Sequence, residues 1–183
     1  MVSVRALRIP EVLIFEPRIF RDARGYFQEA WNARTLSAAG FHENFVQDNL
    51  VHSKRGSIRA LHYQMIRPQG KFVRCVAGEI FDVAVDLRRS SATFGRWVGE
   101  FIDAEKGLAI WIPPGFAHGY CVVSDAATVY YKCTQFYEPE SERTLQWNDP
   151  AIGIEWPLER IGKPILNERD ASAPGIVNAE AYA

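Results

Sequence analysis

Arg59-Ala60-Leu61-His62-Tyr63-Gln64 places a single histidine inside a short run typical of a β-strand, with an arginine three positions before it. Further along, Ile112-Pro113-Pro114-Gly115-Phe116-Ala117-His118-Gly119 has the composition of a proline–glycine turn that leads into another strand. Two such motifs, one in each half of a β-rich chain, predict an antiparallel fold built around them.

Short β-branched and aromatic runs dominate the middle of the chain, and turn-forming residues separate them. The expected strands cover residues 72–76, 80–87, 96–102, 108–112 and 128–135. This spacing favours a mainly β fold, a jelly-roll (cupin-type) antiparallel β-sandwich with a few short helices, over alternating β–α units. One helix is expected over residues 33–39, with Asn32 as its N-cap and Gly40 as its stop.

The length of 183 residues fits a single domain, expected to span residues 1–183, and the 48% hydrophobic content supplies a substantial core. The segment after Trp156 is rich in prolines and is expected to pack along this domain as a tail, with residues 171–183 frayed. A formal charge of −1 gives no reason to expect binding to nucleic acid or to a membrane surface.

The start of the chain and the cysteines bear on its compartment. The first ten residues lack the apolar core of a secretory signal, and no run approaches the length of a membrane span. Cys75, Cys121 and Cys133 lie in apolar or strand-like contexts without metal-site spacing, which favours reduced, buried thiols. We therefore expect a cytoplasmic protein.

The motif around His62 departs from that of metal-binding cupins, which have His-x-His and a glutamate here. This chain has His62-Tyr63-Gln64 at that position. His62 and His118 together would supply two imidazole ligands, whereas catalytic zinc sites use three protein ligands. We therefore expect no metal. Because an imidazole titrates near neutral pH, His62 is a candidate for proton transfer, although strand histidines are more often structural.

Three polar clusters carry charges and amides that a simple core does not need. They cover residues 22–29, residues 47–49 with 53–59, and residues 69–71. Guanidinium groups bind phosphate oxygens through paired hydrogen bonds, so Arg24 and Arg59 suit diphosphate recognition, although solvated turns share this composition. In the expected strand at 128–135, alternation places Tyr131 and Cys133 on one face of the sheet.

Taken together, these residues resemble the dTDP-4-dehydrorhamnose 3,5-epimerase family of nucleotide-sugar enzymes, from Phe15 to about Asp170. The resemblance lies in motifs that occur in order and at compatible spacing: Asp22-x-Arg24-Gly25, Gln47-Asp48-Asn49, Arg59-x-x-His62-Tyr63-Gln64, Gly70-Lys71, IPPGFAHG, Tyr131-Lys132, PESER and WNDP. Any one motif is weak evidence, whereas the ordered set is specific.

The resemblance implies a homodimer without metal or organic cofactor that acts on a 4-keto-6-deoxyhexose carried on thymidine diphosphate. The C4 ketone acidifies the protons on carbons 3 and 5. By resemblance, His62 is the base, Asp170 orients its imidazole, Lys71 stabilises the enolate oxygen, and Tyr131 returns a proton from the opposite ring face. The implied product is dTDP-4-keto-L-rhamnose, on the route to dTDP-L-rhamnose.

The resemblance also implies a set of substrate-binding residues, in which Tyr137 stacks on the thymine. They are Arg24, Glu29, Gln47, Asn49, Arg59, His118, Tyr137, Glu142 and Arg169. Two positions depart from the family pattern. Ala60 replaces the usual glycine and is expected to narrow the pocket floor, and Arg169 replaces the usual lysine before the aspartate, with a different hydrogen-bonding geometry.

Strict strand alternation places Arg59 and His62 on opposite faces, although both are implied to lie near the substrate. Either a bulge lies between them, or Arg59 acts from the mouth of the strand or across the dimer. Three other functions stay open: a related epimerase that inverts only one carbon, a cupin that binds a nucleotide sugar without catalysis, and a metal-dependent dioxygenase-type cupin.

Overall fold

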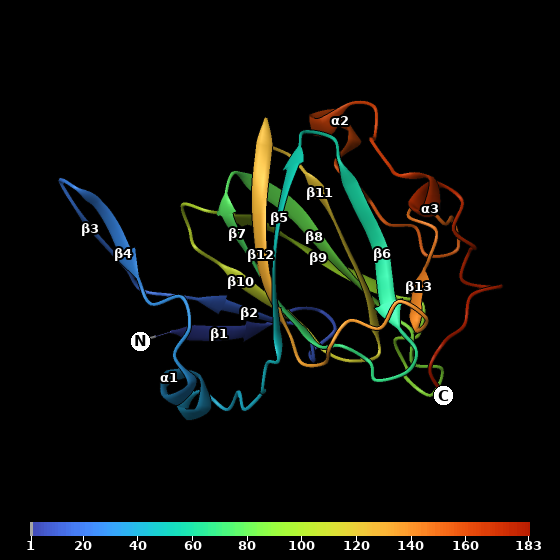
Figure 1. Ribbon diagram of the computed structural model, residues 1–183, viewed down its shortest axis with the longest axis horizontal. Coiled ribbons are helices and arrows are strands. Elements are labelled where there is room, and N and C mark those ends of the chain that lie inside the picture. Colours follow the sequence, from blue (N-terminus) through green and yellow to red (C-terminus); the bar gives the residue numbers. More distant parts are fainter. Residues whose placement is uncertain (1) are drawn as a thin grey trace.

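Two antiparallel β-sheets face each other and enclose an apolar core in the computed structural model, which describes residues 2–183 (Figure 1). The first sheet follows the order β1 (Ser3–Ala6), β2 (Leu13–Glu16), β10 (Ala109–Ile112), β7 (Lys71–Ala77), β12 (Ala126–Cys133) and β5 (Gln47–Lys54). The second sheet follows the order β13 (Glu142–Thr144), β6 (Ile58–Gln64), β11 (Phe116–Val122), β8 (Glu79–Asp86) and β9 (Trp97–Asp103). This arrangement confirms the predicted mainly β sandwich.

The space between the sheets is filled by aliphatic side chains. Val73 and Ile110 from the six-stranded sheet meet Ile80 and Val122 from the five-stranded sheet, and all four are fully buried. Burying one such side chain contributes about 1.5–3 kcal/mol, so this cluster holds the two sheets together.

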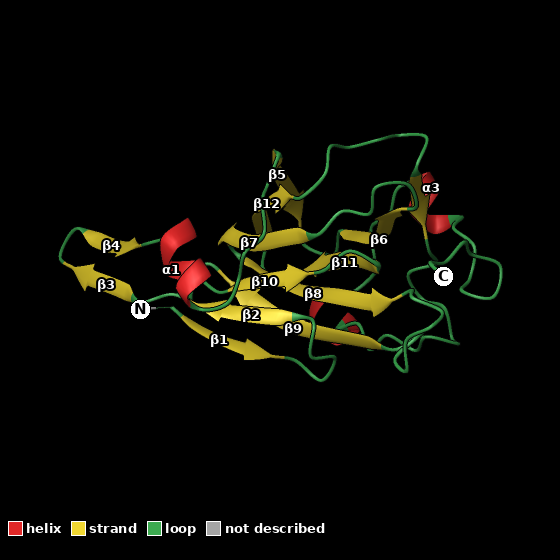
Figure 2. Ribbon diagram, turned by 90° about the horizontal axis from the view of Figure 1, so that it is seen from below, coloured by secondary structure: helices red, strands yellow, loops and turns green. Residues whose placement is uncertain are grey.

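A third sheet consists only of the hairpin β3 (Ile19–Asp22) and β4 (Gly25–Gln28). The hairpin extends away from both large sheets in two perpendicular views (Figures 1 and 2). Phe20, Tyr26 and Phe27 on this hairpin are 49%, 51% and 67% exposed. Because its aromatic rings are exposed to solvent, this two-stranded hairpin gains little stability from packing within its own chain.

Helix α1 (Ala33–Ala38) confirms the helix predicted near the start of the chain. The side chain of Asn32 accepts hydrogen bonds from the backbone N–H groups of Arg34 and Thr35, at 3.0 and 3.2 Å. Gly40 follows with a φ of +85°, a conformation that favours glycine after a helix. The helix packs on the outer face of the six-stranded sheet through Leu36.

Two shorter helices follow the sheets, α2 (Leu158–Ile161) and α3 (Glu168–Ala171). Among residues 2–183, no helix has the length and apolar character needed to cross a membrane.

All five expected strands are present, as β7, β8, β9, β10 and β12, with ends within two residues of their predicted bounds. Strand β5 was not expected, because its residues form one of the polar clusters. It is an edge strand whose side chains alternate between partly buried and exposed, so it lacks the apolar pattern of a central strand. Alternation along β12 is confirmed, since Cys133 faces inward while Lys132 binds Asp48 outside.

A bulge in β6 resolves the placement of Arg59 and His62. Against β11, His62 pairs with His118 and Arg59 pairs with Tyr120, so β6 has two residues between the paired positions where β11 has one. His118 and Tyr120 share one face of β11, and residues paired across strands share a face. The extra residue therefore places Arg59 and His62 on the same face of β6, the face turned toward the other sheet, where Arg59 is exposed and His62 is partly buried.

The tail of the chain packs on the outer face of the five-stranded sheet. Ile176 and Ala179 are buried there. The backbone N–H of Tyr182 donates to the carbonyl of Leu87 at 3.0 Å. These contacts extend through the residues for which fraying was expected, nearly to the end of the chain.

Gly119 permits the close approach of β11 to the bulged part of β6. A Cβ at this position would lie 2.4 Å from Cβ of Ala60 and 2.8 Å from its Cα. Because overpacking of this kind typically costs about 1–3 kcal/mol, Gly119→Ala should lower the free energy of unfolding by that amount in urea titrations. Adding Ala60→Gly should recover part of the loss. Equal stability of Gly119→Ala and the wild type would contradict this packing.

Candidate functional site

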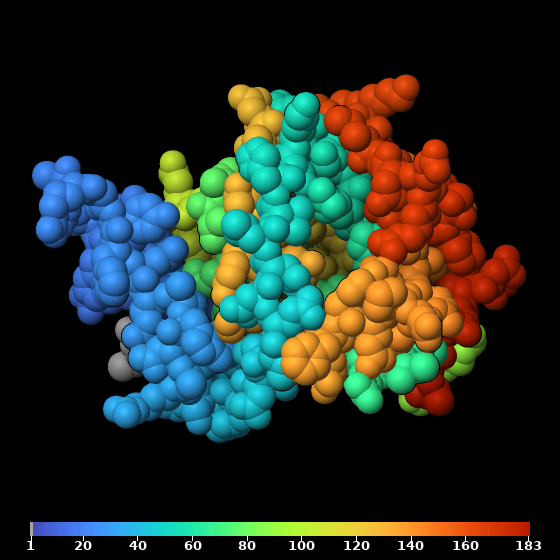
Figure 3. All heavy atoms as spheres, in the orientation of Figure 1, coloured from blue at the N-terminus to red at the C-terminus, as the bar shows by residue number. Residues whose placement is uncertain are grey.

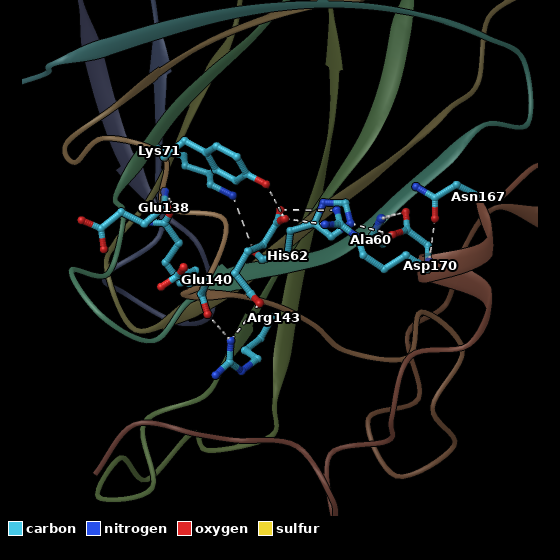
Figure 4. Close-up of polar contacts among 12 residues, drawn as sticks. Ala60, His62, Lys71, Glu138, Glu140, Arg143, Asn167 and Asp170 are labelled. Atoms are coloured by element: carbon cyan, nitrogen blue, oxygen red, sulfur yellow. Dashed lines mark hydrogen bonds and ion pairs between the residues drawn. The ribbon is translucent and has the colours of Figure 1, made fainter.

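His62 and Asp170 form a hydrogen-bonded pair. Nε2 of His62 lies 2.8 Å from Oδ1 of Asp170, and the Asp170 side chain is only 1% exposed (Figure 4). A carboxylate accepts hydrogen bonds, so Nε2 carries the hydrogen and Nδ1 keeps its lone pair. His62 therefore has the tautomer and the orientation of a general base.

Two further hydrogen bonds hold Asp170, one to its carboxyl and one from its backbone. The Ala60 N–H donates to its second oxygen at 3.4 Å. The side chain of Asn167 caps α3 by accepting from the Asp170 N–H at 2.7 Å (Figure 4). The short helix α3 and the bulge in β6 thus fix the two partners of the pair relative to each other.

Tyr131 lies on the other sheet. It belongs to β12 of the six-stranded sheet, whereas His62 belongs to β6 of the five-stranded sheet, and both line one cavity. Burial raises the pKa of the Tyr131 phenol to about 12, so the hydroxyl keeps its proton at neutral pH. The site therefore has an available proton acceptor on one wall and a proton donor on the other.

Lys71 supplies a buried cation at the start of β7. Its side chain lies in the same cavity, and Nζ donates to the carbonyl oxygen of His62 at 3.5 Å (Figure 4). Burial lowers the pKa of Lys71 below the ordinary lysine value. A cation in a poorly hydrated site interacts strongly with negative charge that develops beside it.

The cavity has a volume of about 270 Å³. It opens between β5 and the segment before β13, where the space-filling view shows a hollow (Figure 3). The lining residues are mostly polar: Gln47, Asn49, His62, Gln69, Lys71, Tyr131, Cys133, Tyr137 and Glu142. A larger hollow of about 440 Å³ beside Trp97 contains none of these groups.

A chain of hydrogen bonds crosses the rim of this cavity. Gln47 donates to Asn49 at 3.0 Å and accepts from the Tyr137 N–H at 2.9 Å. The Tyr137 hydroxyl donates to Glu142 at 2.8 Å, and Arg169 forms an ion pair with the same carboxylate. These contacts bring four of the expected substrate-binding residues together at the mouth, with Arg169 behind them.

Arg59 lies on the same face of β6 as His62, but its side chain is exposed and does not line the cavity. Its Nε donates to the hydroxyl of Ser53 at 3.0 Å, and Ser53 belongs to β5 across the opening. The Arg59 side chain is thus exposed, and this contact holds it against β5 of its own chain.

His118 is buried behind the cavity and does not line it. Its Nε2 lies 3.0 and 2.9 Å from the two carboxylate oxygens of Asp82, which is fully buried. His118 therefore contacts the site through His62, its cross-strand partner.

Arg24 and Glu29 are not brought to the cavity of their own chain. Arg24 lies in the turn of the β3–β4 hairpin, where it pairs with Asp22 and its side chain is 89% exposed. Glu29 accepts hydrogen bonds from Asn32 and Thr35 at the start of α1.

The two departures from the family pattern have different places in the structure. The Ala60 side chain is fully buried, with its Cβ against Gly119, and it does not line the cavity. The expected narrowing of the pocket floor is therefore wrong, because the bulge turns Ala60 away from the interior. Arg169 directs two of its nitrogens at Glu142 and holds its Nε 3.8 Å from Asp170.

Three residues of the site are not among the site residues expected from the sequence. Asp82 is the buried partner of His118, and its signal was a charge within the apolar run of β8. Gln69 and Cys133 line the cavity. Cys133 had been assigned only to the core, because alternation identifies the face of a residue but not its distance from an opening.

Sequence comparisons link the whole chain to one family. A family model described as dTDP-4-dehydrorhamnose 3,5-epimerase matches residues 6–178. A curated relative of that name from Pseudomonas aeruginosa is 50% identical over 177 residues, covering 96% of this chain and 97% of the relative. One from Shigella flexneri is 48% identical and covers 99% of both chains.

Solved structures give the same result. A dTDP-6-deoxy-D-glucose-3,5-epimerase from Legionella pneumophila, in complex with dTDP-4-keto-L-rhamnose, has a TM-score of 0.94 and 42% identity, covering 98% of this chain and 95% of that one. A 3'-monoepimerase from Streptomyces bikiniensis, in complex with dTDP-quinovose, has a TM-score of 0.89 and 36% identity, covering 96% and 88%.

Proposed function

The chain belongs to the dTDP-4-dehydrorhamnose 3,5-epimerase family, and on that premise we propose that it converts dTDP-4-keto-6-deoxyglucose to dTDP-4-keto-L-rhamnose by inverting C3 and C5. One observation carries this proposal: the oriented base His62 and the protonated phenol of Tyr131 line one cavity from opposing sheets. A sugar ring held between the two sheets would have one group on each face, as inversion requires.

Each inversion needs a proton to leave one ring face and another to arrive on the opposite face. Nδ1 of His62 takes the proton from the carbon beside the C4 ketone, and the electron pair moves onto the ketone oxygen as an enolate. The ammonium of Lys71 stabilises this oxygen. The Tyr131 hydroxyl then protonates the carbon from the other side, and both residues return to their starting states by proton exchange with solvent.

Asp170 contributes by stabilising the imidazolium that forms on His62, through their 2.8 Å contact. A positioned general base typically increases the rate by about 10²–10⁴-fold. Much of the remaining rate enhancement is therefore assigned to stabilisation of the enolate by the Lys71 cation. The chemistry requires no metal or organic cofactor, because the substrate's own ketone stabilises the carbanion.

The rim residues are assigned to the nucleotide. Tyr137 is 48% exposed at the mouth, where its ring is available to stack on thymine. Gln47 and Asn49 offer amides to hydroxyl and carbonyl groups, and Glu142 with Arg169 holds the Tyr137 hydroxyl. Arg59 is assigned to the diphosphate, and His118 supports His62 from behind.

We assign Arg24 and Glu29 to the cavity of a second copy of the chain, in a homodimer. The β3–β4 hairpin projects from the body (Figure 1). Its three aromatic rings are exposed. Such an arm is stabilised when a partner covers it. Exchange of the arms would bring the guanidinium of Arg24 to the partner's substrate.

We further propose that the protein acts in the cytoplasm. The thiols of Cys75, Cys121 and Cys133 are free and buried, which suits a reducing compartment.

A single-carbon epimerase is the second candidate, because the 3'-monoepimerase from Streptomyces bikiniensis has a very similar structure. The curated relatives at 46–50% identity that carry the 3,5-epimerase name favour the double inversion. A cupin that only binds the sugar would not need a base, an acid and a buried cation around one cavity. This chain has all of these groups in His62 with Asp170, Tyr131 and Lys71.

Deuterium exchange separates these functions. In D₂O the wild type should place solvent deuterium at both C3 and C5 of the keto-sugar, as followed by proton NMR. Label at one carbon would show a single-carbon epimerase, and no label would show a binding protein. His62→Ala should abolish exchange at both positions while nucleotide binding, measured by calorimetry, is retained.

The pH dependence of kcat should report the cation at Lys71. Because burial lowers its pKa, kcat should fall on the alkaline side with a midpoint below 10.5, as the ammonium loses its proton. In Lys71→Arg the guanidinium stays charged, so the midpoint of the alkaline decrease in kcat should move toward the pKa of the Tyr131 phenol, about 12. Lys132→Arg, outside the cavity, should leave the profile unchanged. An identical profile in Lys71→Arg would exclude Lys71 as the titrating group.

Mixed dimers test the arm. A dimer of one His62→Asn protomer and one Arg24→Ala protomer, purified with two different tags, should regain activity if Arg24 acts in the partner's site, because one site then has both native groups. If Arg24 acts in its own chain, both sites stay defective and the mixed dimer has no more activity than the two parent variants.

A further inference from the structure

We propose that residues 174–182, which we call the C-terminal strap, are a positioning element that holds strand β6 so that His62 meets Asp170 in reactive geometry. This inference rests on the proposed function, because it assigns a role to the strap in proton transfer by His62. It concerns Tyr63 and Tyr182, which touch neither the cavity nor the reacting groups.

Strand β6 needs such support because it lies next to the edge of its sheet. Its outer neighbour, β13, has only three residues and pairs with Gln64, Tyr63 and His62. The bulge further reduces regular pairing with β11 on the other side. Beyond β13, Leu61 exchanges backbone hydrogen bonds with Leu145, and the Met65 N–H donates to the carbonyl of Ser141. The outer side of β6 is therefore paired with one short strand and with the residues that flank it.

The strap supplies two hydrogen bonds immediately after His62. The Tyr63 hydroxyl donates to the carbonyl of Glu180 at 2.7 Å. The Tyr182 hydroxyl donates to the carbonyl of Gln64 at 2.6 Å. The two rings pack edge to face, with centroids 6.1 Å apart. The residues that follow His62 are thus bound directly to the strap.

The strap is anchored to parts of the fold other than β6. Tyr182 exchanges backbone hydrogen bonds with Leu87 and Arg89 after the end of β8, at 3.0 and 2.9 Å. The Ile176 N–H donates to the buried carboxylate of Asp149 at 2.6 Å. Glu180 also forms an ion pair with Arg143. These anchors make the strap a fixed support for β6.

The strap continues directly from α3, which carries Asp170. One segment of chain therefore supplies the carboxylate that binds His62 and the groups that bind the two residues after it. Movement of β6 by about 1 Å away from its productive position can cost about 10²-fold in rate. Burial raises the pKa of Tyr63 to about 12, so its hydroxyl stays a donor across the working range of pH.

The test uses Tyr63→Phe, Tyr182→Phe and the double variant, each of which removes only hydroxyl groups from the full-length protein. In the double variant, kcat should fall about 10- to 100-fold, while KM for the keto-sugar stays within about twofold, because the cavity lining is intact. Val177→Ser changes an 85% exposed strap residue and should match the wild type in both constants.

NMR gives a readout independent of turnover. The proton that Nε2 of His62 shares with Asp170 should give a downfield resonance, identified by its absence in His62→Asn. In the double variant this resonance should broaden or shift. A thermal melt of the same sample should show that the variant is folded at the temperature of the NMR measurement. An unchanged resonance, or a kcat loss that matches only a loss of folded protein, would overturn the proposal. If the wild type shows the resonance but catalyses no exchange, the proposed function fails instead.

Discussion

The hydrogen bond between Nε2 of His62 and Oδ1 of Asp170 is the interaction on which the site depends. It joins residues 108 positions apart, so it exists only when the C-terminal part of the chain has packed on β6. It selects the tautomer in which Nδ1 is free, and it places a buried carboxylate beside the imidazole, where the carboxylate would stabilise the imidazolium of the proposed mechanism. The bulge in β6 and the helix α3 position the two partners of this contact, and we propose that the C-terminal strap holds β6 in place beside them.

The sandwich itself supplies the second requirement, groups on two sides of a substrate. Face-to-face sheets lie about 10 Å apart, a separation that side chains normally fill. Between β5 and β6 the sheets instead leave a polar cavity of about 270 Å³. Its walls carry an imidazole on one sheet and a phenol of raised pKa on the other, and the buried Lys71 lines the same cavity. The fold thus places the imidazole and the phenol on opposing walls, which is the arrangement that the proposed inversion requires.

Much of this arrangement could be predicted from the sequence. Apolar alternation identified the central strands, Asn32 and Gly40 marked α1, and the ordered motifs indicated the family. Strand β5 was missed because an edge strand with a polar face resembles a loop in composition. A bulge between Arg59 and His62 was one of the alternatives, but the sequence could not select it, because a shift of one residue in pairing leaves no trace in residue type. The burial of Ala60 against Gly119 depends on the same shift. Asp82 was missed because its partner His118 belongs to a neighbouring strand.

In the proposed mechanism the sugar ring lies between His62 and Tyr131. A crystal structure of His62→Asn with dTDP-4-keto-6-deoxyglucose tests it most directly. C3 and C5 should face residue 62, the Tyr131 hydroxyl should face the opposite side of the ring, and the C4 oxygen should lie within hydrogen-bonding distance of Nζ of Lys71. A sugar bound outside this cavity, or with residue 62 and Tyr131 on the same ring face, would contradict the account.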